Sequence, residues 1–147
     1  MGKKRIIKKG GENRDEQFHL QAAKTKAQTS KKKLSHALVN VLSTYNNTLI
    51  TLTDGEGNAV FQSSSGALGF KGSKKGTPYA ASKAAEVVSE FANTVGVKEL
   101  DIRINGIGAG RESAIRTFTQ FGFSVTSIKD FTPIPHGTPR LKKPRRV

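Results

Sequence analysis

One segment constrains the fold more than any other, because a strand pattern changes there to a helix pattern across three glycines. Residues 99–105 alternate between apolar and polar side chains, as a half-buried strand does. Glycine then occupies every second position from 106 to 110. Beyond it, apolar side chains recur at helical spacing, at Ala114, Ile115, Phe118 and Phe121. The segment therefore predicts a strand that leads directly into a helix, as in an α/β domain.

The start of this helix is a candidate phosphate site. A helix N-terminus presents unpaired N–H groups and the positive end of the helix dipole, and glycine lets an anion approach the backbone without meeting a Cβ. We therefore expect phosphate at a set of glycines and at two arginines on the first turns of the helix. These are Gly106, Gly108, Gly110, Arg111 and Arg116. A tight turn that requires positive φ would produce the same glycines, so that alternative stays open.

Two nucleotide-binding motifs are excluded by their spacing. The third glycine of a dinucleotide fingerprint is replaced by Arg111, and only a basic tail broken by prolines follows the candidate ribose ligand Asp130. The second glycine cluster, residues 66–75, is not a P-loop, because five residues separate Gly66 from Gly72 and no Lys-Ser or Lys-Thr pair follows. We expect instead a long loop at residues 63–75, and we expect its lysine-bearing part, residues 66–75, to be mobile until RNA orders it.

The middle of the chain predicts a single α/β domain, with a mixed five-stranded sheet flanked by helices. The first strand is apolar on both faces, and Asn46 and Asn47 after it suit a turn because Asn tolerates left-handed backbone. Thr77 and Pro78 are typical of a helix start, and Gly96 of a helix end. Right-handed crossovers would place the helices against the faces of the sheet. The order is β-β-β-α-β-α-β, with strands at 37–42, 49–53, 59–63, 99–105 and 124–131 and helices at 78–95 and 111–120.

The net charge of +14 is concentrated at the two ends of the chain. Residues 1–33 hold 11 Lys and Arg against 3 Asp and Glu, residues 34–135 hold 9 against 8, and residues 136–147 hold 5 against none. This division predicts a nearly neutral folded core at residues 34–135 between two nucleic-acid-binding arms, a flexible basic N-terminal extension at residues 1–33 and a basic C-terminal tail at residues 136–147. Cationic arms of this kind are typical of proteins that bind nucleic acid.

Several other classes of protein are disfavoured. The chain has no cysteine, which excludes disulfides and thiolate chemistry, and no apolar run approaches the length of a membrane span. A Ser-His-Asp site would have to use His19, His36 or His136, and His36 is more often a strand histidine than a base. Metal-dependent nuclease chemistry needs clustered carboxylates, which the pattern does not supply. We therefore expect no enzyme activity, no cofactor, no metal site and no membrane partner, and a cytoplasmic location.

Four short motifs follow one another between residues 36 and 147. They are Tyr45-Asn46-Asn47-Thr48, the run from Gly69 to Lys75 with Thr77-Pro78-Tyr79-Ala80-Ala81, Gly110-Arg111-Glu112-Ser113-Ala114-Ile115-Arg116, and Thr132-Pro133-Ile134-Pro135-His136. In order and spacing they resemble the universal small-subunit ribosomal protein S-eleven family, bacterial type.

The resemblance implies a ribonuclease-H-like topology without an active site and a structural role in the small subunit of the cytoplasmic ribosome. It also implies binding to ribosomal RNA of the platform near the messenger exit, beside the S-seven and S-eighteen proteins and close to messenger RNA. An RNA-processing enzyme on the same fold and a free nucleic-acid chaperone are the alternatives. Outside the glycine turn, the expected RNA-binding residues are Asn46, Asn47, Lys71, Gly72, Ser73, Lys74, Lys75, His136, Arg140, Lys142, Lys143, Arg145 and Arg146.

Overall fold

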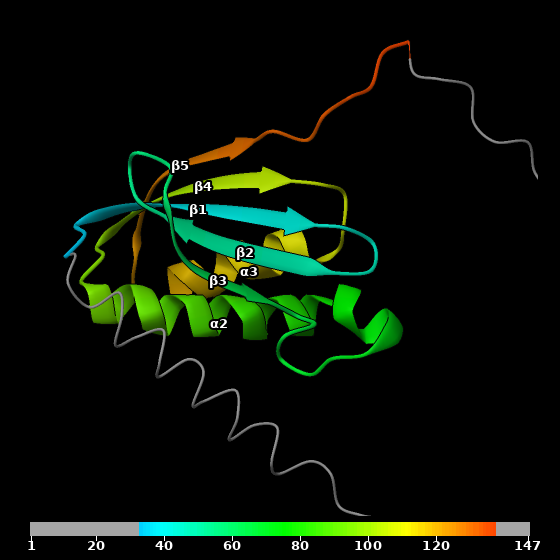
Figure 1. Cartoon of the computed structure of the whole chain (residues 1–147), viewed down its shortest axis with the longest axis horizontal. Helices are drawn as coiled ribbons and strands as arrows, with labels where there is room; N and C mark the ends of the chain where they lie inside the picture. Colours follow the sequence, from blue (N-terminus) through cyan, green and yellow to red (C-terminus); the bar gives the residue numbers. More distant parts are fainter. Residues whose placement is uncertain (1–32, 138–147) are drawn as a thin grey trace, which may run out of the picture.

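Strand β1, His36–Ser43, lies at the centre of a five-stranded mixed sheet (Figure 1). The structure is a computed structural model that describes residues 33–137. The strand order is β3-β2-β1-β4-β5, and β1 pairs antiparallel with β2 and parallel with β4. The expected α/β fold and element order are confirmed. The other strands are β2 (Thr48–Thr53), β3 (Ala59–Ser64), β4 (Glu99–Asn105) and β5 (Ser124–Asp130).

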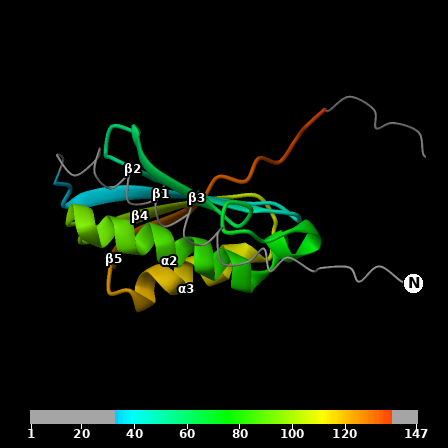
Figure 2. The ribbon, with the colours of Figure 1, turned by 60° about the horizontal axis from the view of Figure 1, so that its bottom comes forward.

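Both long helices lie on the same face of this sheet (Figure 2). Helix α2, Pro78–Val95, connects β3 to β4, and helix α3, Gly110–Gln120, connects β4 to β5. Both connections cross the sheet in the same direction between parallel strands, so a common right-handed sense brings both helices to one side. Within residues 33–137, no helix covers the opposite face.

The hydrophobic core fills the space between the sheet and the helix layer. Every second residue of the central strands is buried there, and α2 meets them with small side chains, which let the helix lie close to the sheet. At the β3 edge, the rings of Phe61 and Phe91 stack with centroids 4.3 Å apart. The fully buried side chains of the strands include Val39, Val41, Ile50, Leu52, Leu100 and Ile102, and those of α2 include Ala81, Ala84, Ala85 and Val88.

Local signals account for the bounds of α2. The Thr77 hydroxyl accepts a hydrogen bond from the Ala80 N–H, and Pro78 occupies the first helical position. Gly96 ends the helix with φ +89°, a conformation that glycine adopts without a Cβ penalty. The predicted start and end of this helix are therefore confirmed.

Three local expectations are wrong. Residues 63–75 are not entirely loop, because a short 3-10 helix, η1, spans Gly72–Gly76. The link between β1 and β2 does not use left-handed asparagine, since no residue other than glycine among residues 33–137 has positive φ. Strand β1 is not covered on both faces along its whole length, because Leu42 is 40% exposed on the face without helices.

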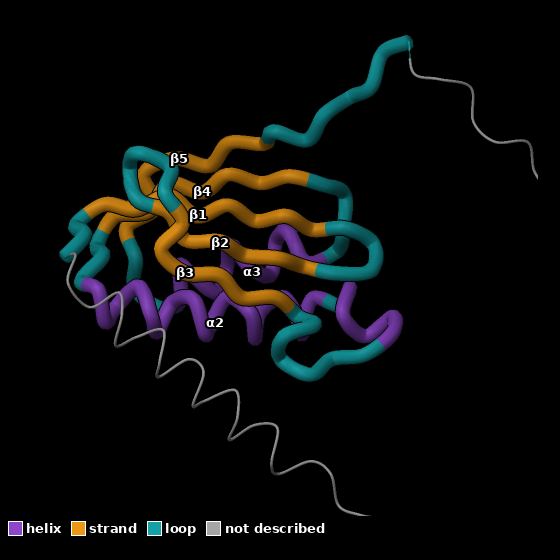
Figure 3. The backbone as a smooth tube through the Cα atoms, in the orientation of Figure 1, coloured by secondary structure: helices purple, strands orange, loops and turns teal. Residues whose placement is uncertain are grey.

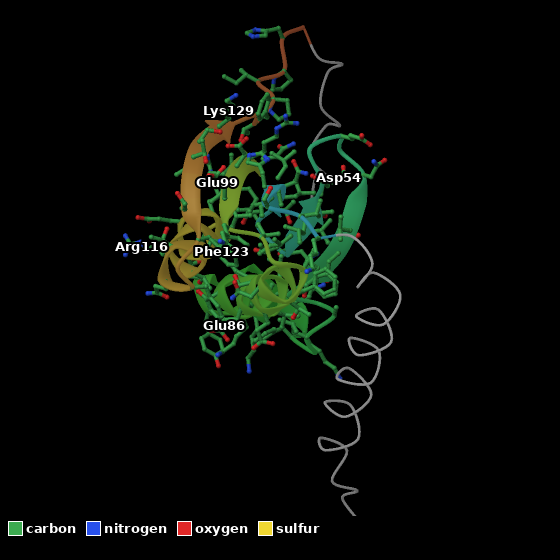
Figure 4. The ribbon with its side chains drawn as sticks, turned by 90° about the vertical axis from the view of Figure 1, so that its left-hand side faces the viewer. Asp54, Glu86, Glu99, Arg116, Phe123 and Lys129 are labelled. Atoms are coloured by element: carbon green, nitrogen blue, oxygen red, sulfur yellow. The ribbon has the colours of Figure 1, made fainter. Side chains whose placement is uncertain are left out.

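Figure 4 looks at the sheet from one end and shows the two layers. Glu86 lies on the helix layer, and Lys129 lies at the opposite side of the molecule, near the end of β5. None of the helices in residues 33–137 has the length and apolar character needed to cross a membrane. The expected N-terminal extension, apart from Lys33, and the tail from residue 138 lie outside the described residues.

Candidate nucleic-acid interface

Three loops that are far apart in the sequence meet at one end of the sheet. They are the β1–β2 link at residues 44–47, the lysine loop at residues 66–76, and the glycine turn at residues 106–110 (Figure 3). Strands β1 and β4 are parallel, so the links that follow them leave the sheet at the same end. The Gly108 N–H joins the glycine turn to the end of β1 by donating to the Ser43 carbonyl at 2.9 Å.

The glycines of the turn are required by close packing against the β1–β2 link. A Cβ on Gly106 would lie 2.2 Å from the Ser43 carbonyl oxygen, and a Cβ on Gly108 would lie 2.3 Å from the Thr44 carbonyl oxygen. Gly106 also has φ +93°, as the tight-turn alternative requires. Gly110 is equally crowded by side chains. These glycines therefore face protein atoms, and phosphate approach at them stays a prediction.

The N-terminus of α3 keeps the character of an anion site. Its N-cap residue is Ala109, which supplies no side-chain hydrogen bond, so no side chain in residues 33–137 caps the first N–H groups. Glu112 lies in the first turn, where a negative charge is favoured by the helix dipole.

Both predicted arginines are already paired with carboxylates. Arg111 pairs with Asp130 at the end of β5, and Arg116 pairs with Glu112 one turn earlier on α3, at 2.6 Å. Figure 4 shows Arg116 projecting outward from the molecule, and its side chain is 70% exposed. Because solvent screens exposed ion pairs, they add little to stability, and exchange of a carboxylate for a phosphate would cost little. The arginines are nevertheless not free charges.

Asp130 also ties the start of the C-terminal tail to the glycine turn. The pKa of its carboxyl is lowered, first by the hydrogen bond from the Thr132 hydroxyl, then by the Thr132 N–H, and to a smaller extent by Arg111. The same hydroxyl accepts a hydrogen bond from the Gly106 N–H at 3.1 Å. The tail therefore departs from the end of the sheet where the three loops meet.

The lysine loop supplies cations without carboxylate partners. Lys71 and Lys74 are exposed and Lys75 is half-buried, and within residues 33–137 none of them makes an ion pair. The Thr77 hydroxyl donates to the Lys74 carbonyl at 2.8 Å, which joins the loop to the start of α2. Gly72, at φ +58°, and exposed Ser73 lie between the lysines. These charges are available to a polyanion without breaking any pair.

The two predicted asparagines have different surroundings. Asn47 accepts a hydrogen bond from the Ser65 hydroxyl at its side-chain oxygen, at 2.6 Å, so this amide helps hold the lysine loop. Asn46 is exposed. A Cβ on Gly76 would lie only 2.1 Å from the Tyr45 carbonyl oxygen, which shows how closely the two loops pack.

Two exposed tyrosines at this end were not predicted as site residues. Tyr45 is 75% exposed in the β1–β2 link, and Tyr79 is 64% exposed in the first turn of α2. The Phe70 ring meets Tyr79 edge to face at 6.0 Å, and the Lys83 ammonium lies 5.9 Å from the Tyr79 ring centroid. Aromatic rings beside cations are typical of sites for unpaired bases. The signal was present in the sequence as tyrosines adjoining the asparagine and lysine motifs.

The remaining predicted residues lie near or beyond the end of the described chain. His136 is exposed after the end of β5. Arg140, Lys142, Lys143, Arg145 and Arg146 lie outside the described residues.

His36, the histidine considered for catalysis, lies far from the loops. It pairs with Asp101 at 3.2 Å, and the pKa of that carboxyl is lowered, chiefly by a hydrogen bond from the Ser127 hydroxyl. The carboxylate here bridges the other two side chains, so the histidine is not positioned to activate the serine. Among residues 33–137, no three His, Asp or Glu side chains form a group that could hold a metal ion.

The fold and the loop end together have the features of a basic α/β nucleic-acid-binding protein: free lysines, exposed tyrosines and a cationic tail that departs beside them. A family model described as ribosomal protein S11 matches residues 37–146. The chain belongs to the ribosomal protein S11 family. This confirms the family that the four motifs indicate.

Two relatives show how far the similarity extends. A protein of Acidiphilium cryptum named small ribosomal subunit protein uS11 is 48% identical over 127 residues, which cover 86% of this chain and 98% of the relative. A protein of Chromobacterium violaceum with the same name is 50% identical over 117 residues, which cover 80% of this chain and 89% of the relative.

Proposed function

We propose that this protein is a structural constituent of the small ribosomal subunit and that the loop end of its sheet binds ribosomal RNA. The observation that carries the proposal is the set of three lysines without acidic partners where the three loops meet. The names of the two relatives, both small ribosomal subunit proteins, support the assembly to which the chain would belong.

Each part of the loop end has a physical role in this proposal. Lys71, Lys74 and Lys75 neutralise phosphates, and Tyr45 and Tyr79 offer rings on which unpaired bases can stack. The glycines let the loops pack closely enough to form one surface. Arg111 and Arg116 contribute after they exchange their carboxylate partners. The cationic residues of the tail add further phosphate contacts.

The finer location follows from the family resemblance. We propose the platform of the subunit near the messenger exit, with the S-seven and S-eighteen proteins as neighbours, in the cytoplasmic ribosome. We also propose that the protein is not an enzyme. The arrangement of His36, Asp101 and Ser127 supports this. The Asp101 carboxylate contacts both other side chains, so the histidine does not lie where it could activate the serine.

Charge-matched variants of the full chain test the RNA site. Replacing Lys71 and Lys74 by glutamine should weaken binding to a small-subunit ribosomal RNA fragment. The slope of log affinity against log salt concentration should become smaller in magnitude by about 0.7–0.9 for each phosphate that is no longer neutralised. The matched comparison is between the single variants Lys71→Gln and Lys98→Gln, because Lys98 is exposed near the opposite end of the sheet. Equal losses of affinity in the two variants would mean that only net charge matters, and the proposed site would be wrong.

A further variant distinguishes the contribution of the arginines to RNA binding from that of the lysines. Replacing Arg111 and Arg116 by glutamine should weaken RNA binding less than the loop variant does, because each arginine must first give up an ion pair. The melting temperature should change little, since both pairs are exposed. A larger loss of affinity in the arginine variant would move the main phosphate site to the glycine turn.

Sedimentation of particles from the source cells distinguishes the structural role from an RNA-processing enzyme or a free chaperone. A subunit constituent should co-sediment with the small subunit in a one-to-one ratio. A processing enzyme would be substoichiometric, and a chaperone would spread over many RNAs.

A further inference from the structure

The face of the sheet without helices carries a second group of polar, cationic and aromatic side chains, separate from the lysine loop. On β4, Arg103 and Asn105 point to this face, because the residues that alternate with them are buried against the helices. Asn40 and Leu42 on β1 lie in register beside them. Together with Phe131 they line a shallow pocket where β1, β4 and the end of β5 meet.

An aromatic ring and a guanidinium form one wall of this pocket. Phe131 is 54% exposed, and the Arg103 guanidinium carbon lies 5.4 Å from its ring centroid. Arg103 makes no ion pair within residues 33–137, so its side chain keeps its charge available beside the ring. Two flat groups, one aromatic and one cationic, are therefore held together at the surface without a carboxylate.

The floor of the pocket offers unused hydrogen-bonding groups. Neither the Asn40 nor the Asn105 side-chain amide makes a hydrogen bond within residues 33–137, although Asn40 is half-buried. Each amide has a donor group and an acceptor, which is the combination that pairs with a base edge. The two amides lie beside the guanidinium and the ring on the same surface.

The size and surroundings of the pocket narrow the choice of occupant. Its volume of about 280 Å³ lies just below the range of roughly 300–1,000 Å³ typical of small-molecule sites, and it is open to solvent. The chain leaves this face at Phe131 and Thr132, and its sequence then continues to the five cations between residues 140 and 146, so the pocket adjoins the start of a cationic segment. Exposed rings and arginine planes on an open sheet are a recurrent platform for unpaired bases.

We propose that this pocket binds an unpaired nucleobase of RNA, by stacking on Phe131 and Arg103 and by hydrogen bonds to Asn40 and Asn105. The inference rests on the proposed RNA-binding function and adds a second site, which reads a base where the lysine loop neutralises phosphates. The two sites lie on different surfaces of the sheet end, so a single-stranded segment or bulge bound here leaves the lysine loop free for other phosphates.

Binding of single-stranded and double-stranded RNA by the full chain tests the proposal. One probe is a single-stranded oligonucleotide with 2-aminopurine at one position, and the other is a hairpin duplex with the same number of phosphates. Phe131→Leu and Arg103→Gln should each reduce affinity for the single strand about fivefold or more, the effect expected for one stacked base, and leave the duplex nearly unchanged. Both should also reduce the quenching of 2-aminopurine on binding.

Matched controls keep the result interpretable. Phe121→Leu removes another exposed phenylalanine, at the end of α3, and Lys98→Gln removes an exposed cation near the opposite end of the sheet. Neither should distinguish single strand from duplex, and melting temperatures identify any variant that fails to fold. Because Phe131 and Arg103 are exposed and lie on different elements, both variants are expected to stay folded.

The outcomes separate this inference from the proposed function. A wild-type chain that binds neither RNA would overturn the proposed function. A chain that binds both RNAs through Lys71 and Lys74, but is unaffected by Phe131→Leu and Arg103→Gln, would overturn only the base pocket and would leave this face to a protein neighbour. Equal losses of affinity for single strand and duplex would reduce Arg103 to a phosphate ligand and would also overturn the pocket.

Discussion

Glycines of the turn between β4 and α3 lie against backbone atoms of the β1–β2 link, at distances that no side chain tolerates. The same residues were predicted from the sequence as an opening for phosphate. The close packing of the glycines and the charged groups beside the turn are thus separate features. The packing can be tested by adding a methyl group to a glycine. The charged groups can be tested by changing the hydrogen bonds around Asp130.

Gly108→Ala should destabilise the fold. The added Cβ would lie 2.3 Å from the Thr44 carbonyl oxygen and 2.5 Å from the Ser43 hydroxyl, so the β1–β2 link would have to move. Overpacking of this kind costs about 1–3 kcal/mol, measured as a shift in the urea midpoint. Gly55→Ala is the control, since a Cβ there would meet nothing within 4 Å and the φ of Gly55 is not positive. Equal stability of the two variants would show that the link is free to shift.

Thr132→Val should raise the pKa of Asp130 more than Arg111→Gln does, because the Thr132 hydroxyl is the largest cause of the lowered value. A lowered pKa in the folded state stabilises the fold above the ordinary carboxyl value of 3.8, and that contribution is lost as pH falls through the folded value. Carboxyl titration by NMR measures both shifts. A larger shift in the arginine variant would make the ion pair, and not the threonine, the dominant interaction.

At the scale of elements, the lysine loop combines local order with free charge. Helix η1 and the Thr77 cap connect it to α2, and the Phe70–Tyr79 contact anchors its centre. Its lysines make no ion pairs within the described residues. An element of this kind can retain its turns and still change its dynamics when a polyanion binds.

Amide exchange should be fast at residues 66–75 in the free protein and slower in complex with the cognate RNA fragment. Part of the loop is exposed, and phosphates would bridge Lys71, Lys74 and Lys75. Exchange of the buried strand β1 provides the internal reference, because it should be slow in both states. Equal protection of the loop with and without RNA would place it away from the interface.

At the scale of the whole molecule, the chain combines a nearly neutral folded core with strongly cationic ends. Within residues 33–137, a continuous set of apolar side chains is buried between the sheet and the helices. We therefore expect folding and long-range attraction to RNA to depend on different parts of the chain.

Removal of residues 1–33 or 136–147 should weaken RNA binding and leave the core folded. Each phosphate that an arm no longer neutralises lowers the dependence of log affinity on log salt by about 0.7–0.9, so titrations at several salt concentrations show how many phosphates each arm binds. Far-ultraviolet circular dichroism and thermal melts monitor the fold. A truncated chain that unfolds would contradict this division between core and arms.

Secondary structure was largely predictable because its determinants are local. The period-two pattern located β4 at its observed bounds, Glu99–Asn105, and the Thr77-Pro78 start and Gly96 end located α2. The Thr44–Asn47 turn was located correctly but for the wrong reason. Its backbone is held by Thr44, whose hydroxyl and N–H both donate to the Asn47 carbonyl, and a side chain chosen for left-handed φ is not needed.

The sequence by itself determined the elements, their order, the charge division and the family motifs, because periodicity, caps and motif spacing are properties of neighbouring residues. Only the tertiary structure decided which distant groups meet. It paired Arg111 with Asp130, packed the glycines against the β1–β2 link, and put both helices on one face, which left Arg103 and Phe131 together on the other. Such contacts depend on strand order and crossover direction, which bring together side chains that no local pattern connects.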